Sequence, residues 1–117
     1  MTHRLEVQGL YAAMNVSDLK SSESFYTKVL GRPPDDRPLV TLVQWRGYGA
    51  AGIQLFEDAG KAGQGRMTLV VPDMAEVERM LREQGLRLGE VQSGDFGKVA
   101  HIGDFDGNVV TFAEPPG

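Results

Sequence analysis

The alternation of apolar and polar side chains first becomes regular between Tyr11 and Val16. Side chains two residues apart lie on the same face of a strand, and their immediate neighbours lie on the other face. One face would carry Ala12, Met14 and Val16, and the other would carry Tyr11, Ala13 and Asn15. This segment therefore predicts a strand with two chemically different faces.

A helix is predicted after this strand. The apolar residues that recur at intervals of three and four are Phe25, Tyr26, Val29 and Leu30. Asp18 stands before them as a favourable N-cap residue, and Gly31 with the prolines after it ends the pattern. Residues 39–45 and 52–56 then predict two strands, separated by the turn-like residues 46–49. The first half therefore has the order βαββ or βαβββ.

The second half of the chain repeats this order. The residues that alternate as a strand are Met67, Leu69 and Val71, and those with helical spacing are Val77, Met80 and Leu81. Asp73 would cap this second helix, Glu76 would complete a capping box, and Gly85 would end the helix. Strand and amphipathic helix thus follow one another twice along the chain.

The two halves also match residue by residue. Residues 16–19 correspond to 71–74, and residues 53–57 correspond to 110–114 at nearly the same offset. An internal duplication explains this match economically. The Gly-rich residues 59–65 lack apolar periodicity and predict a flexible connection. We expect one domain over residues 1–117, with a first module at about 8–58 and a second at about 65–115.

The repeated order predicts an α+β fold built from two βαβββ modules in tandem. One helix per module would cover one face of its sheet and leave the other face open. The two open faces can curl together into a cup-shaped mixed sheet around a cavity. Such a cavity is the default place for a small-molecule site.

Composition and charge narrow the range of functions. The chain has 117 residues, of which 41% are hydrophobic and 24% charged, as in an ordinary soluble globular domain. Its lack of cysteine excludes disulfides and thiolate metal sites. A net charge of −4 with scattered basic residues argues against a nucleic-acid surface. We expect a cytoplasmic protein, since no long apolar run and no secretory signal is present.

Two motifs near the ends of the chain are fairly specific. The first is Val-Ser-Asp-Leu at residues 16–19 followed by Phe-Tyr-Thr-Lys-Val-Leu-Gly at 25–31, and the second is Ile-Gly-Asp-Phe-Asp-Gly-Asn-Val-Val at 102–110. Together they resemble the opening and closing signatures of the vicinal-oxygen-chelate superfamily of glyoxalases, bleomycin-resistance proteins and dioxygenases. Phe105 replaces a proline of the closing signature. The resemblance implies the glyoxalase/bleomycin-resistance fold and a homodimer whose ligand sites lie in grooves.

The resemblance also implies four metal-ligand positions on the concave sheet face. Here Tyr11 and Arg66 hold the two positions where the family's enzymes usually have His or Gln, and Gln54 and Thr111 hold the two where they usually have Glu. A guanidinium group stays protonated and offers no lone pair, so Arg66 would repel a divalent ion. The other three residues cannot hold an ion firmly enough to leave an open coordination position for a substrate. We therefore expect no metal and no other cofactor.

The same alternation predicts a polar ligand-binding face. Its side chains would be Tyr11, Ala13, Asn15, Gln54, Arg66, Thr68 and Thr111, and by the resemblance His101 would join them. Trp45 and Tyr48 are candidates for an aromatic wall or a dimer contact, with core packing as an equal alternative. Hydroxyl, amide, guanidinium and imidazole groups suit a polar or anionic small molecule.

Each of these residues also has a simpler interpretation. Arg66 could extend into solvent, and His101 could be a structural or surface residue. Tyr11 and Gln54 could fill the former metal site with a buried hydrogen bond. Glu57 and Glu114 occupy matching repeat positions, which solvated strand ends would explain. His3 precedes the first strand and is expected to have no role.

Three functions remain open from the sequence. The first is a metal-independent protein that binds a small molecule, similar to the drug-binding resistance proteins of the family. The second is an enzyme, either a lyase, isomerase or dioxygenase with a poorer metal site, or a metal-free catalyst that uses His101 or Tyr11 as acid or base. The third is a structural or regulatory partner of another protein, which an exposed apolar patch beside a filled cup would indicate.

Overall fold

The computed structural model describes residues 4–117, so His3 lies outside the described residues. The first half of the chain forms β1 (Leu10–Val16), α1 (Leu19–Leu30), β2 (Asp36–Leu39), β3 (Leu42–Tyr48) and β4 (Ala51–Glu57). The second half forms β5 (Arg66–Val70), α2 (Met74–Glu83), β6 (Gln92–Gly94), β7 (Gly97–Gly103) and β8 (Val109–Glu114). Neither helix of residues 4–117 is long and apolar enough to cross a membrane.

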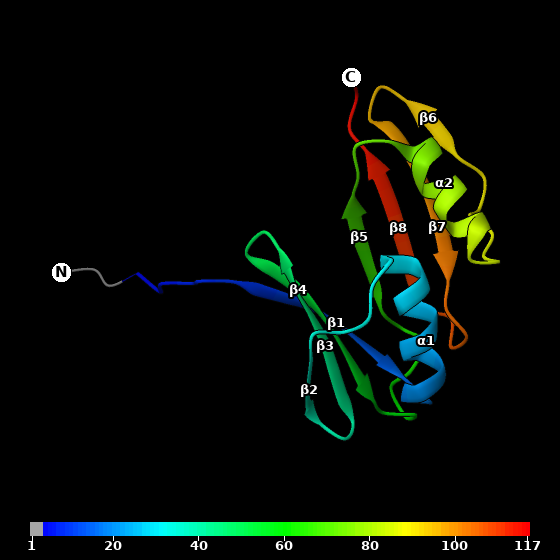
Figure 1. Cartoon of the computed structure of the whole chain (residues 1–117). Helices are drawn as coiled ribbons and strands as arrows, with labels where there is room; N and C mark the ends of the chain where they lie inside the picture. The colour runs from blue at the N-terminus through cyan, green and yellow to red at the C-terminus, as the bar shows by residue number, and fades with distance from the viewer. Residues whose placement is uncertain (1–3) are drawn as a thin grey trace.

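The two halves form two four-stranded mixed sheets with the same topology. The strand orders are β1-β4-β3-β2 and β5-β8-β7-β6, and in each sheet the first strand pairs in parallel with the last. This is the predicted α+β arrangement of two βαβββ units. Figure 1 shows the sheets inclined to one another, with residues 4–9 extending away from both. β1 and β5 are therefore free edge strands.

The hairpin of β2 and β3 differs from the prediction in its bounds. The predicted strand over residues 39–45 is divided by a turn at Val40 and Thr41, whose β-branched side chains are typical of strands. The predicted turn at residues 46–49 lies mostly inside β3. There the register shifts between Trp45 and Tyr48, and Gly47 takes a positive φ of 88°. This bulge absorbs the turn-like residues without ending the strand.

Both helices receive a cap from the last strand of their own unit. Asp18 occupies the predicted N-cap position of α1, but its side chain makes no cap hydrogen bond. Instead the Leu19 N–H donates to Glu57 at 3.0 Å. In α2 the Met74 N–H donates to Glu114 at 2.6 Å, while Asp73 accepts from Ala75 N–H as an N-cap should. Glu57 and Glu114 are thus equivalent capping residues.

The predicted capping box of the second helix is not formed. The carboxylate of Glu76 pairs with Arg79, one turn further along α2, instead of returning to Asp73. An ion pair between positions i and i+3 is a normal alternative on an exposed helix surface. The first turn of α2 therefore uses Asp73 and Glu114 as its cap.

The helix-facing sides of both sheets form the core. The buried strand residues on these sides include Met14, Val16, Val43, Trp45, Ile53 and Leu55 in the first sheet, and Met67, Ala100, Ile102, Val110 and Phe112 in the second. Phe25, Tyr26 and Val29 of α1 and Leu81 of α2 pack against them. The alternation predicted for β1 is confirmed near its end, because Met14 and Val16 are buried. Burial on one side leaves the opposite side of each sheet for polar residues.

A buried set of hydrogen bonds joins the two units. The hydroxyl of Tyr26 donates to Asp104 at 2.9 Å, and the Asn108 side-chain amide donates to Asp104 at 2.8 Å and to the Asn15 carbonyl at 2.9 Å. Burial first, and then the carboxylate of Asp104, raise the pKa of Tyr26. We call Tyr26, Asp104 and Asn108 the junction network.

The connection between the units packs closely against this network. The Gly65 N–H donates to Asn108 Oδ1 at 2.8 Å. Gly63 has a φ of 89°, and a Cβ atom there would lie 2.1 Å from the Asp106 carbonyl oxygen. The prediction of a flexible connection at residues 59–65 therefore missed the role of its glycines. They allow two backbone segments to approach closely.

Candidate functional site

Three polar side chains form a row across the first sheet, on the face opposite α1. Ala13 is in register with Gln54, Gln54 with Gln44, and Gln44 with Asp36. Gln54 Nε2 donates to Gln44 Oε1 at 3.1 Å, and Gln44 Nε2 donates to Asp36 Oδ2 at 3.1 Å. We call Gln54, Gln44 and Asp36 the glutamine row. All three are half-buried, so the row is partly open to solvent.

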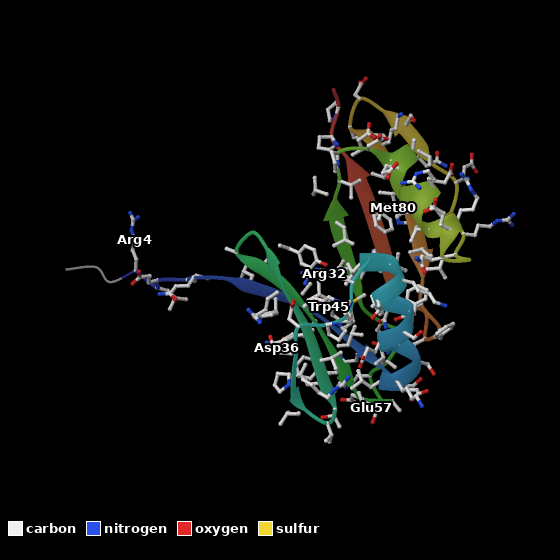
Figure 2. The ribbon with its side chains drawn as sticks, viewed as in Figure 1. Arg4, Arg32, Asp36, Trp45, Glu57 and Met80 are labelled. Carbon is white, nitrogen blue, oxygen red and sulfur yellow. The ribbon has the colours of Figure 1, made fainter. Side chains whose placement is uncertain are left out.

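The glutamine row ends in an ion pair. Arg46 Nε donates to Asp36 Oδ2 at 2.6 Å, which lowers the pKa of Asp36, with a smaller contribution from Gln44. Figure 2 shows Asp36 on the side of the first sheet away from α1, whereas Trp45 lies on the side of the helix. The row therefore begins with a neutral amide and ends with a paired carboxylate.

Tyr11 lies beside the row on β1. Its register partner on β4 is Gly52, and a Cβ atom at Gly52 would lie 2.6 Å from the Tyr11 ring. The ring therefore rests directly on the Gly52 backbone, a place that only glycine leaves free. No hydrogen bond between Tyr11 and Gln54 is present among residues 4–117, so the pair does not fill the face in the way that the simpler interpretation proposed.

The second sheet carries a matching but shorter row. Thr68 is in register with Thr111, and Thr111 with His101. His101 Nδ1 lies 2.8 Å from Thr111 Oγ1, a hydrogen bond whose direction depends on the imidazole tautomer. His101 and Thr68 are exposed, and Arg66 at the start of β5 is exposed as well. This face therefore presents hydrogen-bond donors and acceptors to solvent.

An apolar groove runs between the two units. It has a volume of about 990 Å³ and is lined on the helix side by Val29, Leu30, Val77 and Met80, and along the edge strands by Leu10, Tyr11, Thr68, Leu69 and Val70. Tyr11 and Thr68 are the predicted face residues that line it. Gln54, Arg66, His101 and Thr111 lie outside it. The predicted residues thus lie on two separate polar faces, one on each sheet. The groove does not connect these two faces.

Two predicted residues have structural positions. Trp45 is fully buried on the helix side of β3, and its indole N–H donates to the Arg32 carbonyl at 2.9 Å. The alternation of β3 decides this, because Trp45 follows Gln44 and must face the other way. The core-packing alternative therefore describes Trp45 correctly. Asn15 is half-buried, and its carbonyl group serves the junction network.

The residues at the four family metal positions do not fit a metal ion. Gln54 uses its amide in the glutamine row, Thr111 bonds to His101, and Arg66 is a cation. A divalent ion requires several carboxylate or imidazole ligands that converge on one point. Residues 4–117 contain no group of three or more His, Asp or Glu side chains that could hold one. The amide, hydroxyl and guanidinium groups at these positions are therefore suited to hydrogen bonding and not to holding a metal ion.

Sequence reasoning missed two of the three residues of the glutamine row. Gln44 and Asp36 were not among the candidates, although the alternation of Gln44 with Val43 and Trp45 in the sequence was a usable signal. Asp36 could be recognised only from the pairing of β2 with β3, which depends on where the hairpin turns. A one-residue change of register would have placed its carboxylate on the other face.

No family model matches the chain, and no curated protein matches it significantly. Structural similarity is much stronger than sequence similarity. This is expected when a fold tolerates many hydrophobic sequences in its core.

Several solved structures similar to the chain share one fold. A glyoxalase/bleomycin resistance protein from Catenulispora acidiphila DSM 44928 is 26% identical with a TM-score of 0.86, covering 92% of this chain and 98% of that protein. TnmS3, an antibiotic-binding protein from Streptomyces sp. CB03234, is 24% identical with a TM-score of 0.79, covering 99% and 100%.

A third similar structure is a bleomycin resistance determinant encoded on the transposon Tn5. It is 20% identical with a TM-score of 0.74, covering 90% of this chain and 95% of that protein. These neighbours agree with the strand order, the two helices and the repeat found in the chain. The chain therefore has the glyoxalase/bleomycin-resistance fold of the vicinal-oxygen-chelate superfamily, which confirms the resemblance in its two terminal motifs.

Proposed function

We propose that the protein binds a small molecule without a metal ion, in the manner of a drug-binding or resistance protein. The observation that carries this proposal is the glutamine row. Gln54 occupies a metal-ligand position of the fold, yet its amide is held by Gln44 and remains partly open to solvent. A fixed, accessible amide at the centre of a sheet face is suited to recognise a ligand by hydrogen bonding.

The similar structures support the same proposal. One of them is an antibiotic-binding protein, and another is a bleomycin resistance determinant. The residues at the metal positions favour binding over Lewis-acid chemistry, since Arg66 has no lone pair to offer an ion and the Thr111 hydroxyl is engaged by His101. The similar structures and the side chains at these positions therefore both favour ligand binding through hydrogen bonds.

Thermal-shift and calorimetric binding assays test this proposal. Metal-free bleomycin and a panel of planar antibiotics serve as probes, each with and without a chelator. We expect at least one probe to raise the melting temperature equally in both conditions. The variant Gln54→Leu should weaken that binding, while Gln92→Leu, which changes an exposed glutamine on β6, should not. Binding that disappears with the chelator would contradict metal independence.

We also propose that the chain forms a homodimer through its apolar groove. Five of its large exposed apolar residues line that groove, namely Leu10, Tyr11, Tyr48, Val70 and Met80. Residues 4–9 extend away from the body (Figure 1), and Leu5 and Val7 on this segment are 88% and 58% exposed. We assign the groove to this segment of a second copy, which a two-fold axis would exchange reciprocally.

Sedimentation equilibrium measures the proposed dimer. The double variant Leu5→Asp with Val7→Asp should raise the dimer dissociation constant by about 100-fold or more, because two apolar contacts would become buried charges. Val40→Asp is the matched control, since Val40 is also 88% exposed but lies in the turn between β2 and β3. A monomeric wild-type protein, or equal dimerisation of all three proteins, would refute the proposed interface.

A further inference from the structure

The direction of the hydrogen bonds in the glutamine row is fixed from its charged end. Asp36 accepts from Arg46 Nε at 2.6 Å and from Arg46 Nη2 at 3.3 Å, which favours the ionised carboxylate. An ionised carboxylate can only accept hydrogen bonds. Gln44 must therefore turn its Nε2 group, and not its carbonyl oxygen, toward Asp36.

This choice is passed on to the next residue. With its Nε2 group engaged by Asp36, Gln44 turns Oε1 toward Gln54. A carbonyl oxygen can only accept, so Gln54 must supply its own Nε2 group, which it does at 3.1 Å. An amide that could rotate freely on an isolated residue is thus held in one of its two orientations.

The orientation leaves one acceptor without a partner. Within residues 4–117, no group donates a hydrogen bond to Gln54 Oε1. The register partner of Gln54 on the next strand, β1, is Ala13, whose methyl group cannot donate. Tyr11, two residues away, lies with its ring on Gly52. The face therefore offers a carbonyl oxygen beside an aromatic ring and an unobstructed alanine.

We propose that Asp36, acting through Gln44, holds Gln54 with its carbonyl oxygen outward, and that the face selects ligands that bring a hydrogen-bond donor to this oxygen. The proposal rests on the proposed function and names the chemical class of its ligand: a planar group with an N–H or O–H edge. Asp36 and Gln44 are positioning residues in this arrangement, because they act through Gln54. A ligand that offers only hydrogen-bond acceptors would place an acceptor against the Gln54 carbonyl oxygen and bind more weakly.

Side-chain amide exchange in the ligand-free protein tests the orientation. The Gln54 NH₂ group of uniformly ¹⁵N-labelled protein should exchange with solvent at least about threefold more slowly in the wild type than in Gln44→Ala, because a hydrogen-bonded donor is protected. The variant Asp36→Asn should lie between them, since an asparagine can donate as well as accept. Equal exchange in wild type and Gln44→Ala would overturn the proposal. The backbone spectrum of each variant verifies that it is folded.

Two neutral probes test the ligand class. Indole carries one N–H donor, and 1-methylindole has the same ring without it. In wild-type protein we expect indole to bind about five- to tenfold more tightly, measured from shifts of the Gln54 side-chain signal, as one hydrogen bond would give. In Asp36→Asn the ratio should fall toward one. Since both probes are uncharged, the lost carboxylate cannot change the ratio through simple attraction.

A control variant at an unrelated carboxylate, and the meaning of a negative binding result, complete the probe experiment. Asp95→Asn removes a carboxylate from the exposed loop between β6 and β7 and should keep the wild-type ratio. Equal binding of both probes to the wild type, or an unchanged ratio in Asp36→Asn, would overturn the proposal. If neither probe moves the Gln54 signal, the predicted selectivity is wrong, while failure of every antibiotic probe as well would remove the proposed function itself.

Discussion

The junction network and the glutamine row have the same chemistry in opposite surroundings. Each contains an aspartate, Asp104 or Asp36, that accepts several hydrogen bonds. Asp104 is buried and receives all its donors from the protein, from α1 and from its own loop. Asp36 is partly exposed, and at the other end of its row Gln54 has an open acceptor. The difference teaches that burial makes a polar chain structural, whereas an unfinished chain at the surface is available for recognition.

The largest expected effect is at the centre of the junction network. Replacing Asp104 by Ala leaves the Tyr26 hydroxyl, the Asn108 amide and two backbone N–H groups without their acceptor. We expect a loss of about 3–5 kcal/mol in the free energy of unfolding, measured by urea denaturation. Asp95→Ala, in an exposed loop, should leave that free energy nearly unchanged. A loss below about 1 kcal/mol for Asp104→Ala would remove the contrast between the two regions.

A smaller loss is expected at Tyr26, with a characteristic pH dependence. Tyr26→Phe removes one hydrogen bond to a carboxylate and should cost about 1.5–3 kcal/mol near neutral pH. Because the folded protein raises the pKa of Tyr26, its stabilisation is complete below the unfolded value of about 10 and declines as pH rises above it. Thermal unfolding at increasing alkaline pH should therefore bring wild type and Tyr26→Phe together. Parallel curves would show that the hydroxyl is not linked to folding.

The helix caps should lie between the two regions in their effect on stability. Glu57→Ala and Glu114→Ala each remove the acceptor of one helix N–H and should each lower the free energy of unfolding by about 1 kcal/mol. The two losses should be similar and additive in the double variant, because the residues occupy separate units. Urea denaturation of the three variants measures this. Strongly unequal losses would contradict the structural equivalence of the repeat.

The smallest effect on stability is expected in the glutamine row itself. Gln44→Ala should change the free energy of unfolding by no more than about 0.5 kcal/mol, since both its partners remain accessible to water. The same variant should still alter the amide exchange of Gln54. If Gln44→Ala destabilised the protein as strongly as Tyr26→Phe, the row would be a structural element like the junction network.

The fold could be predicted because its signals are local and occur twice. The alternation at the end of β1, where Met14 and Val16 are buried, the helical spacing at Phe25–Leu30 and Gly31 with a φ of 81° agree with the structure, whereas Ala12 is exposed. Boundaries failed where tertiary contacts override local preference. The turn at Val40 and Thr41 is one such place, and the replacement of Asp18 by Glu57 as the capping group is another.

The candidate site could be predicted only in part. Face membership follows from alternation alone, which correctly separates Gln54 from Ile53 and Leu55. The hydrogen-bond partners of Gln54 depend on strand register. The register depends in turn on where the β2–β3 hairpin turns, which the sequence did not predict. How the two polar faces lie relative to each other depends on the packing of whole units, which no local pattern contains.

The capping glutamates also give the chain an order of assembly. Glu57 reaches its helix across 38 residues and Glu114 across 40, whereas the bond from Tyr26 to Asp104 spans 78. Closing a short loop loses less chain entropy than closing a long one. During synthesis the first unit can therefore complete its helix cap while Asp104 is still inside the ribosome. We therefore expect the hydrogen bonds of the junction network to form last. They form when the second unit, joined through residues 59–65, packs against the folded first unit.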